Sequence, residues 1–422
     1  MQYNLLPIPP EPECPGDAVE GGVDVARGFR SSGVCGGLRP DGSDRDDMAL
    51  VCADAPACVA GVFTRNRFCS APVRVCREHL AASEVAQAVV LNSVIANAAT
   101  GEPGLENARA TASMAARELG CSPEQVLVAS TGVIGSQLPM EAVARGVRLA
   151  VGALGSDEAH DLAAARAIMT TDTVPKRAAV RYVDPSGATY AVGGMCKGAG
   201  MIAPNMATML GVITTDAPVV TPVLRHALRE AASLSFNHVI VDGDTSTNDS
   251  VILLASGAAG GERIDEASGE RYELFYRALL WVCSKLAQSI AADGEGATVL
   301  VRVSVTGAAT PGDAELACRT VASSPLVKTA IAGHDPNWGR IAAALGRSGA
   351  SFSQEDVDID IVGLPVLRSG LPVAFDRQEA ARRFELPRCE IACDLGAGSD
   401  SYVCWTCDLT HGYVSINADY TS

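Results

Sequence analysis

The chain has 422 residues, and hydrophobic residues make up 48% of it while charged residues make up only 19%. This length exceeds what one hydrophobic core usually supports, so we expect at least two lobes, and the apolar content is typical of a packed soluble protein rather than a disordered one. The formal net charge of −16 argues against a surface that binds nucleic acid or anionic lipid, and it is compatible with small-molecule substrates.

The N-terminal segment, residues 1–17, carries Pro7, Pro9, Pro10, Pro12 and Pro15 and has no lysine or arginine. It has the features of neither a signal peptide nor a transit peptide. We therefore expect an irregular, mobile lead-in and a cytoplasmic protein. No run of residues approaches the 18 or more apolar residues of a membrane span.

Helical and strand patterns alternate along the whole chain, which predicts an α/β or α+β protein. The expected strands cover residues 89–92, 126–129, 209–213, 239–241 and 298–305. The expected helices cover residues 105–119, 157–168, 221–231 and 274–290. Gly120 is a plausible C-terminal cap for the first of these helices, and Pro222 suits the start of the third.

The fourteen cysteines are scattered, and in a chain without a signal sequence they are best interpreted as reduced thiols in the core. One group, Cys389, Cys393, Cys404 and Cys407, has a spacing that also permits a zinc site or a thioredoxin-like pair. The flanking segments are typical of a β-hairpin in which alternate residues of the first strand share one face. Packing is therefore the favoured interpretation.

The most informative stretch is glycine-rich and covers residues 193–216. It leads to Thr208, which directly precedes an apolar strand-like run. A threonine held there is a candidate nucleophile, and it needs either a neighbouring base or its own freed α-amino group after cleavage of the Ala207–Thr208 bond. No histidine lies in a convincing triad pattern, which favours the second route. The alternative is an ordinary glycine-rich loop entering a buried strand.

Further polar clusters follow the predicted strands. Thr131 and Gly132 could donate a hydroxyl and a backbone N–H to a developing oxyanion, although a plain strand-to-loop junction has the same sequence. Lys197 could hold a substrate carboxylate, and Glu295 between two glycines could hold an amine. A solvated lysine and a helix-stop turn are the corresponding alternatives. The polar stretch 241–249 lacks the glycine and the glutamate of an EF-hand calcium loop.

Several blocks match one known family in the right order. They are AGVFTRNR (60–67), VLVASTGVIG (126–135), IMTTDT (168–173), KGAGMIAPNMATML (197–210), VDGDTSTND (241–249), DGEGAT (293–298), DPNWGRI (335–341) and WTCDLT with YVSINADY (405–420). From about residue 28 to its end the chain resembles the ornithine acetyltransferases of arginine biosynthesis, also called glutamate N-acetyltransferases. Such a series of blocks is far more specific than any single motif.

The resemblance implies a layered α/β sandwich of two lobes, with the active site between them. It also implies a precursor that cleaves itself between Ala207 and Thr208. The products would be an α chain of residues 1–207 and a β chain of residues 208–422, which would stay associated as α2β2.

The implied reaction moves an acetyl group from N-acetylornithine to glutamate in a ping-pong cycle through an acetyl-Thr208 intermediate. Thr131 and Gly132 match the oxyanion hole of the family. The residues that match substrate-binding positions are Thr171, Lys197, Thr208, Glu295, Asn417 and Ser422. The resemblance implies no metal or redox cofactor. Family members differ in whether they also accept acetyl-CoA, and the sequence leaves this open.

The chain departs from the family pattern in the segment 92–97, a change that would alter substrate choice or weaken activity if this loop lies near the pocket. The family usually has Gly-Asn where this chain has Val94-Ile95, so a backbone position tolerant of positive φ and one polar side chain are lost. Ser422 replaces the more frequent threonine and keeps the hydroxyl. Three alternatives remain: a paralogous acyltransferase with another donor or acceptor, an N-terminal-nucleophile amidohydrolase that uses water, and an unprocessed scaffold.

Overall fold

The computed structural model describes residues 4–203 and 209–419. They form two compact units, which confirms the expectation of at least two lobes. Unit 1 contains residues 4–11, 238–243 and 287–419, and unit 2 contains residues 12–203, 209–237 and 244–286. The predicted cleavage point does not separate the units, because unit 2 includes residues on both sides of it.

Unit 2 is built on a nine-stranded sheet in the order β1-β6-β7-β8-β9-β3-β4-β5, with β2 paired to β3. Its strands are β1 (Asp17–Val19), β2 (Phe29–Val34), β3 (Met48–Phe63), β4 (Val85–Asn92), β5 (Val126–Ser130), β6 (Lys176–Val183), β7 (Thr189–Lys197), β8 (Leu210–Thr215) and β9 (Ser250–Ala255). Every residue of β8 and β9 is buried, as expected for strands covered on both faces. The strands expected at 89–92, 126–129 and 209–213 are confirmed as β4, β5 and β8.

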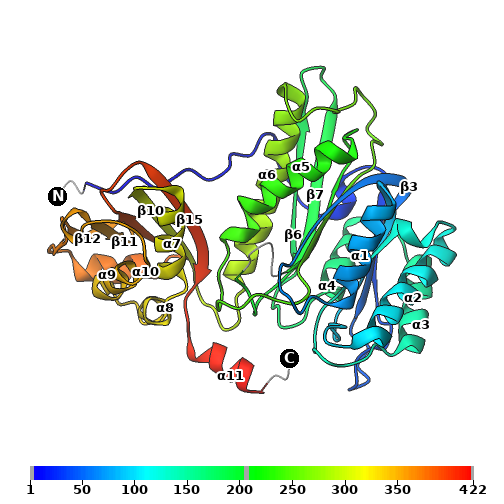
Figure 1. The fold of residues 1–422 in the computed structure, drawn as a ribbon, viewed down its shortest axis with the longest axis horizontal. Coiled ribbons are helices and arrows are strands. Elements are labelled where there is room, and N and C mark those ends of the chain that lie inside the picture. Colours follow the sequence, from blue (N-terminus) through cyan, green and yellow to red (C-terminus); the bar gives the residue numbers. More distant parts are fainter. Residues whose placement is uncertain (1–3, 204–208, 420–422) are drawn as a thin grey trace. The chain divides into compact units, whose positions relative to one another are not determined.

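Helices pack on this sheet, with α1 against β5, α4 against β2 and α5 against β3. Figure 1 shows α1, α4 and α5 alongside strands of this sheet. The helices are α1 (Ala71–Ala82), α2 (Gly101–Leu119), α3 (Met140–Gly152), α4 (Glu158–Ala167), α5 (Thr221–Ser233) and the long α6 (Glu270–Ala292). All four expected helices are confirmed. Gly120 caps α2 with a φ of 74°, and Asp157 caps α4 by accepting a hydrogen bond from the backbone of His160.

Unit 1 has a six-stranded sheet in the order β13-β12-β11-β14-β10-β15. The strands are β10 (Leu300–Ala308), β11 (Asp358–Ile361), β12 (Leu364–Arg368), β13 (Leu371–Pro372), β14 (Arg388–Asp394) and β15 (Asp400–Cys407). The helices are α7 (Pro311–Ala322), α8 (Pro325–Ala332), α9 (Trp338–Gly346), α10 (Arg377–Phe384) and α11 (His411–Asp419). Figure 1 shows α7 beside β10 and β15, against which it packs. Four 3₁₀ turns complete the described elements: η1 (Val23–Val25), η2 (Pro123–Gln125), η3 (Phe236–His238) and η4 (Gln354–Asp356).

The predicted hairpin between β14 and β15 is wrong, although both strands exist. Each pairs with β10, which lies between them, parallel to β14 and antiparallel to β15. The connecting turn passes over the end of β10, where the Gly307 carbonyl accepts hydrogen bonds from Ala397 and Gly398. A buried strand has backbone N–H and C=O groups on both edges that need partners, and β14 and β15 supply them for β10 instead of pairing with each other.

The strand expected at 239–241 is also wrong. Only Val239 forms a bridge there, with Trp405, directly after η3. A strand of three residues has few ladder bonds to gain, so tertiary contacts decide its conformation.

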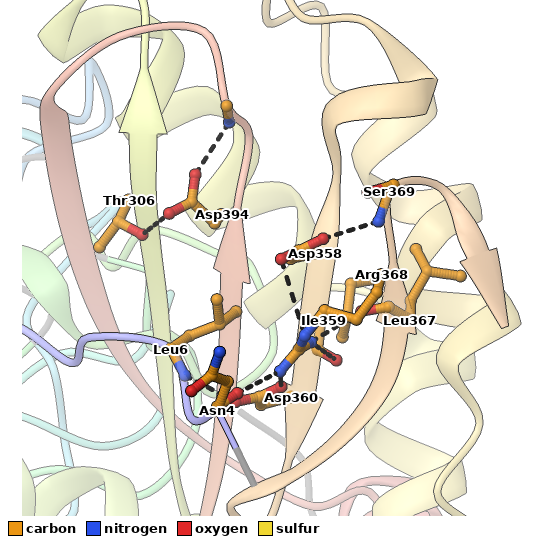
Figure 2. Close-up of polar contacts among 11 residues, drawn as sticks. Asn4, Leu6, Thr306, Asp358, Ile359, Asp360, Leu367, Arg368, Ser369 and Asp394 are labelled. Carbon is orange, nitrogen blue, oxygen red and sulfur yellow. Dashed lines mark hydrogen bonds and ion pairs between the residues drawn. The ribbon is translucent and has the colours of Figure 1, made fainter. Parts of the chain in front are cut away.

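The N-terminal segment is irregular as predicted, and residues 4–11 contact the sheet of unit 1. The Asp360 carboxylate accepts a hydrogen bond from the Leu6 N–H at 2.8 Å, and Arg368 donates to the Asn4 carbonyl at 2.8 Å (Figure 2). Glu11 pairs with Arg388 of β14. These contacts fix the segment on the sheet of unit 1.

Layered packing of helices on both sheets confirms the predicted α/β class. Within the described ranges, no helix combines the length and the apolar character needed to cross a bilayer.

Candidate active site

The turn after β5 places Thr131 and Gly132 against the segment that follows β4. The Thr131 N–H donates to the Asn92 carbonyl at 2.9 Å, which continues the parallel ladder of β4 and β5. Gly132 has a φ of 126°, and an ideal Cβ on it would lie 2.1 Å from the Val94 carbonyl carbon. Only glycine fits this position. The predicted turn of a hydroxyl residue and a glycine at the strand end is therefore present.

The departure from the family pattern lies directly beside this turn. Val94 has a φ of 77°, and the Ile95 N–H donates to the Ser93 carbonyl at 3.0 Å, which makes a three-residue γ-turn around Val94. The Val94 carbonyl in turn accepts from the Val133 N–H at 2.9 Å. A β-branched residue at positive φ is a genuine outlier, so the backbone at Val94 is strained.

Asn248 fixes the two segments to each other. Its amide nitrogen donates to the carbonyls of Ala96 at 2.6 Å and Ser130 at 2.7 Å, and the side chain is buried. This asparagine belongs to the polar stretch 241–249, for which the sequence offered no role. The stretch supports the turn at Thr131 from a distant part of the chain.

Lys197 lies at the end of β7, and its Nζ is 3.5 Å from the Thr131 hydroxyl oxygen. The structure thus brings together two predicted site residues that are 66 positions apart. A third residue, Asp172, joins them, because its carboxylate lies 3.7 Å from Lys197 Nζ and 2.7 Å from Lys176 Nζ. The side chains of Asp172, Lys176 and Lys197 are 0%, 1% and 10% exposed.

Sequence reasoning gave Asp172 and Lys176 no role, because their pairing depends on burial that the sequence does not show. Burial alone would raise the pKa of Asp172, but the ammonium groups of Lys197 and Lys176 hold this pKa well below its usual range. The Gly198 N–H adds a hydrogen bond of 2.7 Å to the same carboxylate. Asp172 is therefore ionised in the folded protein.

The other predicted residues of this region are placed as follows. Thr171 precedes Asp172 in the chain and is partly exposed. The predicted nucleophile Thr208 and the cleavage partner Ala207 lie outside the described residues, as does Ser422. The description resumes at Met209, which is buried and directly precedes β8.

Unit 1 brings together Glu295 and Asn417, which are 122 positions apart. The Asn417 amide donates to the Glu295 carboxylate at 2.7 Å. The connection is tight, because Gly296 has a φ of 69° and an ideal Cβ on it would lie 2.3 Å from the Tyr413 backbone nitrogen. The glycine therefore lets α11 begin against the turn that carries Glu295.

Each group of side chains suits one part of an amino-acid substrate. An ammonium group, a hydroxyl and a glycine N–H are suited to a carboxylate and to a developing oxyanion. A buried carboxylate with a neighbouring amide is suited to an amino group. The described residues thus offer the polar groups that the sequence predicted, in two clusters, one in each unit.

The described parts of the chain hold no group of histidine, cysteine, aspartate or glutamate residues that could bind a metal ion. The four cysteines whose spacing permits a zinc site lie buried on β14 and β15, with β10 between these strands. Burial raises the pKa of the Cys389 thiol to about 12, so it stays protonated. Their arrangement supports the packing interpretation.

A family model described as "ArgJ family" matches residues 30–422. The arginine biosynthesis bifunctional protein ArgJ of Symbiobacterium thermophilum is 50% identical over 95% of this chain and 98% of its own. The protein of the same name from Thermosynechococcus vestitus is 47% identical over 96% of this chain and 99% of its own. A chloroplastic ArgJ of Sorghum bicolor is 45% identical over 97% of this chain and 89% of its own.

Two solved structures are also similar. The crystal structure of ArgJ from Bacillus halodurans aligns with a TM-score of 0.49 and 43% identity, over 50% of this chain and 100% of that one. Ornithine acetyltransferase from Mycobacterium tuberculosis, complexed with ornithine, aligns with a TM-score of 0.43 and 39% identity, over 45% of this chain and 99% of that one. The resemblance drawn from the sequence blocks is confirmed by the family model and by relatives of nearly equal length: the chain belongs to the ArgJ family.

Proposed function

We propose that this protein transfers an acetyl group from N-acetylornithine to glutamate, after cutting its own chain between Ala207 and Thr208. Family membership over nearly the whole chain supports the reaction class. The observation that carries the proposal is the approach of Lys197 to Thr131, beside a glycine that tolerates no side chain. The Lys197 ammonium group suits a substrate carboxylate, and it lies next to the Thr131 hydroxyl, which together with the Gly132 N–H suits an oxyanion.

Cleavage would supply the missing base. A free α-amino group on Thr208 has an ordinary pKa of about 7.7–8.0, which suits a general base near neutral pH. The sheet of unit 2 supports continued association of the two products. In that sheet β8, from the β chain, pairs with β7 of the α chain, and β9, from the β chain, pairs with β3 of the α chain.

The chemistry follows in two halves. The Thr208 hydroxyl attacks the acetyl carbonyl carbon while the α-amine takes the hydroxyl proton. The resulting oxyanion accepts hydrogen bonds from the Thr131 hydroxyl and the Gly132 N–H, and one such donor is typically worth about 10²–10³ in rate. The C–N bond then breaks, the proton passes to the ornithine nitrogen, and an acetyl ester remains on Thr208. The glutamate amine attacks this ester, and the same steps run in reverse.

Substrate binding would use both clusters of side chains. Lys197 and Thr171 would hold the substrate carboxylate, while Glu295, oriented by Asn417, would hold an amino group. Ser422 is proposed as a further substrate contact. We further propose that two αβ pairs assemble as α2β2, which light scattering on the purified enzyme tests. No metal or redox cofactor enters these steps.

The test is an assay of ornithine release from N-acetylornithine with and without glutamate, beside Thr208→Ala. We expect glutamate-dependent transfer and, without glutamate, a 208–422 chain heavier by one acetyl group. Sustained acetyl release without glutamate would favour the amidohydrolase alternative. A clear preference for another N-acetyl amino acid would favour the paralogue.

A second activity is suggested by the word "bifunctional" in the names of the relatives. We propose acetyl-CoA as an alternative donor for the same Thr208. Replacing N-acetylornithine by acetyl-CoA in the assay tests this, and formation of N-acetylglutamate that is absent in Thr208→Ala is the expected result. Transfer from N-acetylornithine alone would contradict it.

A further inference from the structure

Four side chains of unit 2 form a continuous polar chain, from Lys176 through Asp172 and Lys197 to Thr131. The successive contacts are 2.7 Å, 3.7 Å and 3.5 Å. Asp172 is fully enclosed, whereas Lys197 is the more exposed of the two lysines. Asp172 therefore cannot reach a substrate itself, but it contacts a residue that can.

The contact with Lys197 decides how the Thr131 hydroxyl is oriented. An ammonium group can only donate hydrogen bonds, so the Thr131 oxygen accepts from Lys197. The single hydroxyl proton then points to another acceptor. A developing oxyanion requires a donor of this kind.

Asp172 is itself held rigidly. Its carboxylate accepts from the Gly198 N–H at 2.7 Å and from the Thr170 N–H at 3.1 Å, in addition to its two lysines. Backbone donors on both sides leave the carboxylate little freedom to turn. Lys197 is therefore anchored to the main chain through Asp172.

The local charge points the same way. Lys197 brings a positive charge into a buried place, and the neighbouring Cys196 thiol is neutral because burial raises its pKa to about 12. A buried positive charge favours a carboxylate and an oxyanion over neutral groups. This charge lies at the residue that contacts Thr131.

We propose that Asp172 is a positioning residue for acetyl transfer, which holds Lys197 against Thr131 and so makes the Thr131 hydroxyl a donor. The inference rests on the proposed function and adds a residue to its machinery. It assigns to Asp172 a role that acts through Lys197, without contact to the substrate.

The first test is a double-mutant cycle with Asp172→Asn and Thr131→Val, measured on the processed enzyme. We expect Asp172→Asn to lower kcat/KM for N-acetylornithine about 100-fold, comparable to the loss of one oxyanion donor. In the Thr131→Val background the same change should cost less than about tenfold, because residues that act as a unit are not additive. Additive losses would overturn the proposal.

The second test is the pH dependence of the ratio of variant to wild-type kcat/KM. Asp172→Asn removes a negative charge that lies 2.7 Å from Lys176 Nζ and 3.7 Å from Lys197 Nζ, so loss of a proton from a lysine becomes easier. The ratio should therefore rise as the pH is lowered. A loss of activity that is the same at every pH would indicate a merely structural role.

Two further variants keep the tests decisive. Asp172→Asn combined with Lys176→Met removes one charge of each sign, so the summed charge of the cluster is unchanged while Lys197 still loses its anchor. We expect the double variant to fold and to retain the loss in kcat/KM. Recovery of wild-type activity in it would contradict positioning by Asp172.

The matched control is Asp216→Asn. Asp216 is buried in the same unit and, like Asp172, accepts from a cation, Arg27, at 2.8 Å and from two backbone N–H groups, those of Ala191 at 2.7 Å and Arg27 at 3.3 Å. We expect Asp216→Asn to lower the stability of the protein, and we expect its effect on kcat/KM to be additive with that of Thr131→Val. A wild-type enzyme that transfers no acetyl group would refute the proposed function. If the wild type is active, but the loss of kcat/KM caused by Asp172→Asn is additive with that of Thr131→Val and the same at every pH, this inference alone is refuted.

Discussion

The carbonyl group of Val94 occupies the place that a side chain on residue 132 would need. An ideal Cβ on Gly132 would lie 2.1 Å from the Val94 carbonyl carbon and 2.2 Å from its oxygen. The Val94 oxygen is also fixed by the Val133 N–H. The segment that follows β4 and the segment that follows β5 thus together define the geometry of the proposed oxyanion site.

This contact predicts the effect of Gly132→Ala. The backbone would have to move away from Val94 and leave its φ of 126°, which costs about 2–3 kcal/mol of stability. The displaced N–H should lower kcat about 100-fold or more. Thermal unfolding and steady-state acetyl transfer measure both effects. An active, equally stable variant would show that the turn is free to move.

A second prediction compares Val94→Gly with Val94→Ala. Both remove the valine side chain, but only glycine adopts a φ of 77° without strain. We expect the glycine variant to be more stable than the alanine variant by about 1 kcal/mol, the reverse of the usual order. Urea unfolding of the two proteins gives the difference. A more stable alanine variant would contradict the strain at Val94.

A third prediction concerns pH. Burial, followed by the carboxylates of Asp161 and Asp157, raises the pKa of Asp24 to about 8, against a hydrogen bond from Ser31 that lowers it. The folded protein therefore binds a proton that the unfolded chain releases near pH 4. Stability contributed by this proton is present at low pH and is lost as the pH rises towards 8.

Between about pH 5 and pH 8 the free energy of unfolding should fall by about 1 kcal/mol per pH unit through this group. Asp24→Asn keeps the contact with Ser31 and cannot ionise, so its unfolding free energy should decline less steeply over the same range. Chemical denaturation of both proteins at several pH values measures the two slopes. Equal slopes would show that Asp24 is ionised in the folded state.

A fourth prediction is that removal of metal leaves the protein unchanged. Strands lie about 4.8 Å apart in a sheet, so β14 and β15 are about 10 Å apart across β10. Tetrahedral zinc, with bonds of about 2.3 Å, needs its four sulfurs closer together. A chelator should therefore not shift the melting temperature. A decrease that zinc reverses would restore the zinc interpretation of the four cysteines.

Much of the fold could be predicted from local patterns, and the errors have a common cause. Long helices such as α2 and α6, and buried strands such as β5, follow from periodicity and caps that are visible in the sequence. The hairpin failed because β10, remote in sequence, inserts between β14 and β15. Local pairing preferences carry no information on such an insertion.

The candidate site shows the same division. Lys197 and Thr131 were recognised by residue type and family pattern, and the fold brings them together. Asp172 and Asn248 were missed because their roles depend on partners that are distant in sequence or on burial. A buried ion pair, or an amide that donates to two distant carbonyls, is apparent only once the chain is folded.

The central claim is the self-activated threonine, and the most direct test is the intact mass of the purified protein beside that of Thr208→Ala. We predict two wild-type fragments, one ending at Ala207 and one beginning at Thr208, and a single uncut chain for the variant. A wild-type protein that stays uncut, with no acetyl transfer, would contradict the account, because the mechanism would then lack its base.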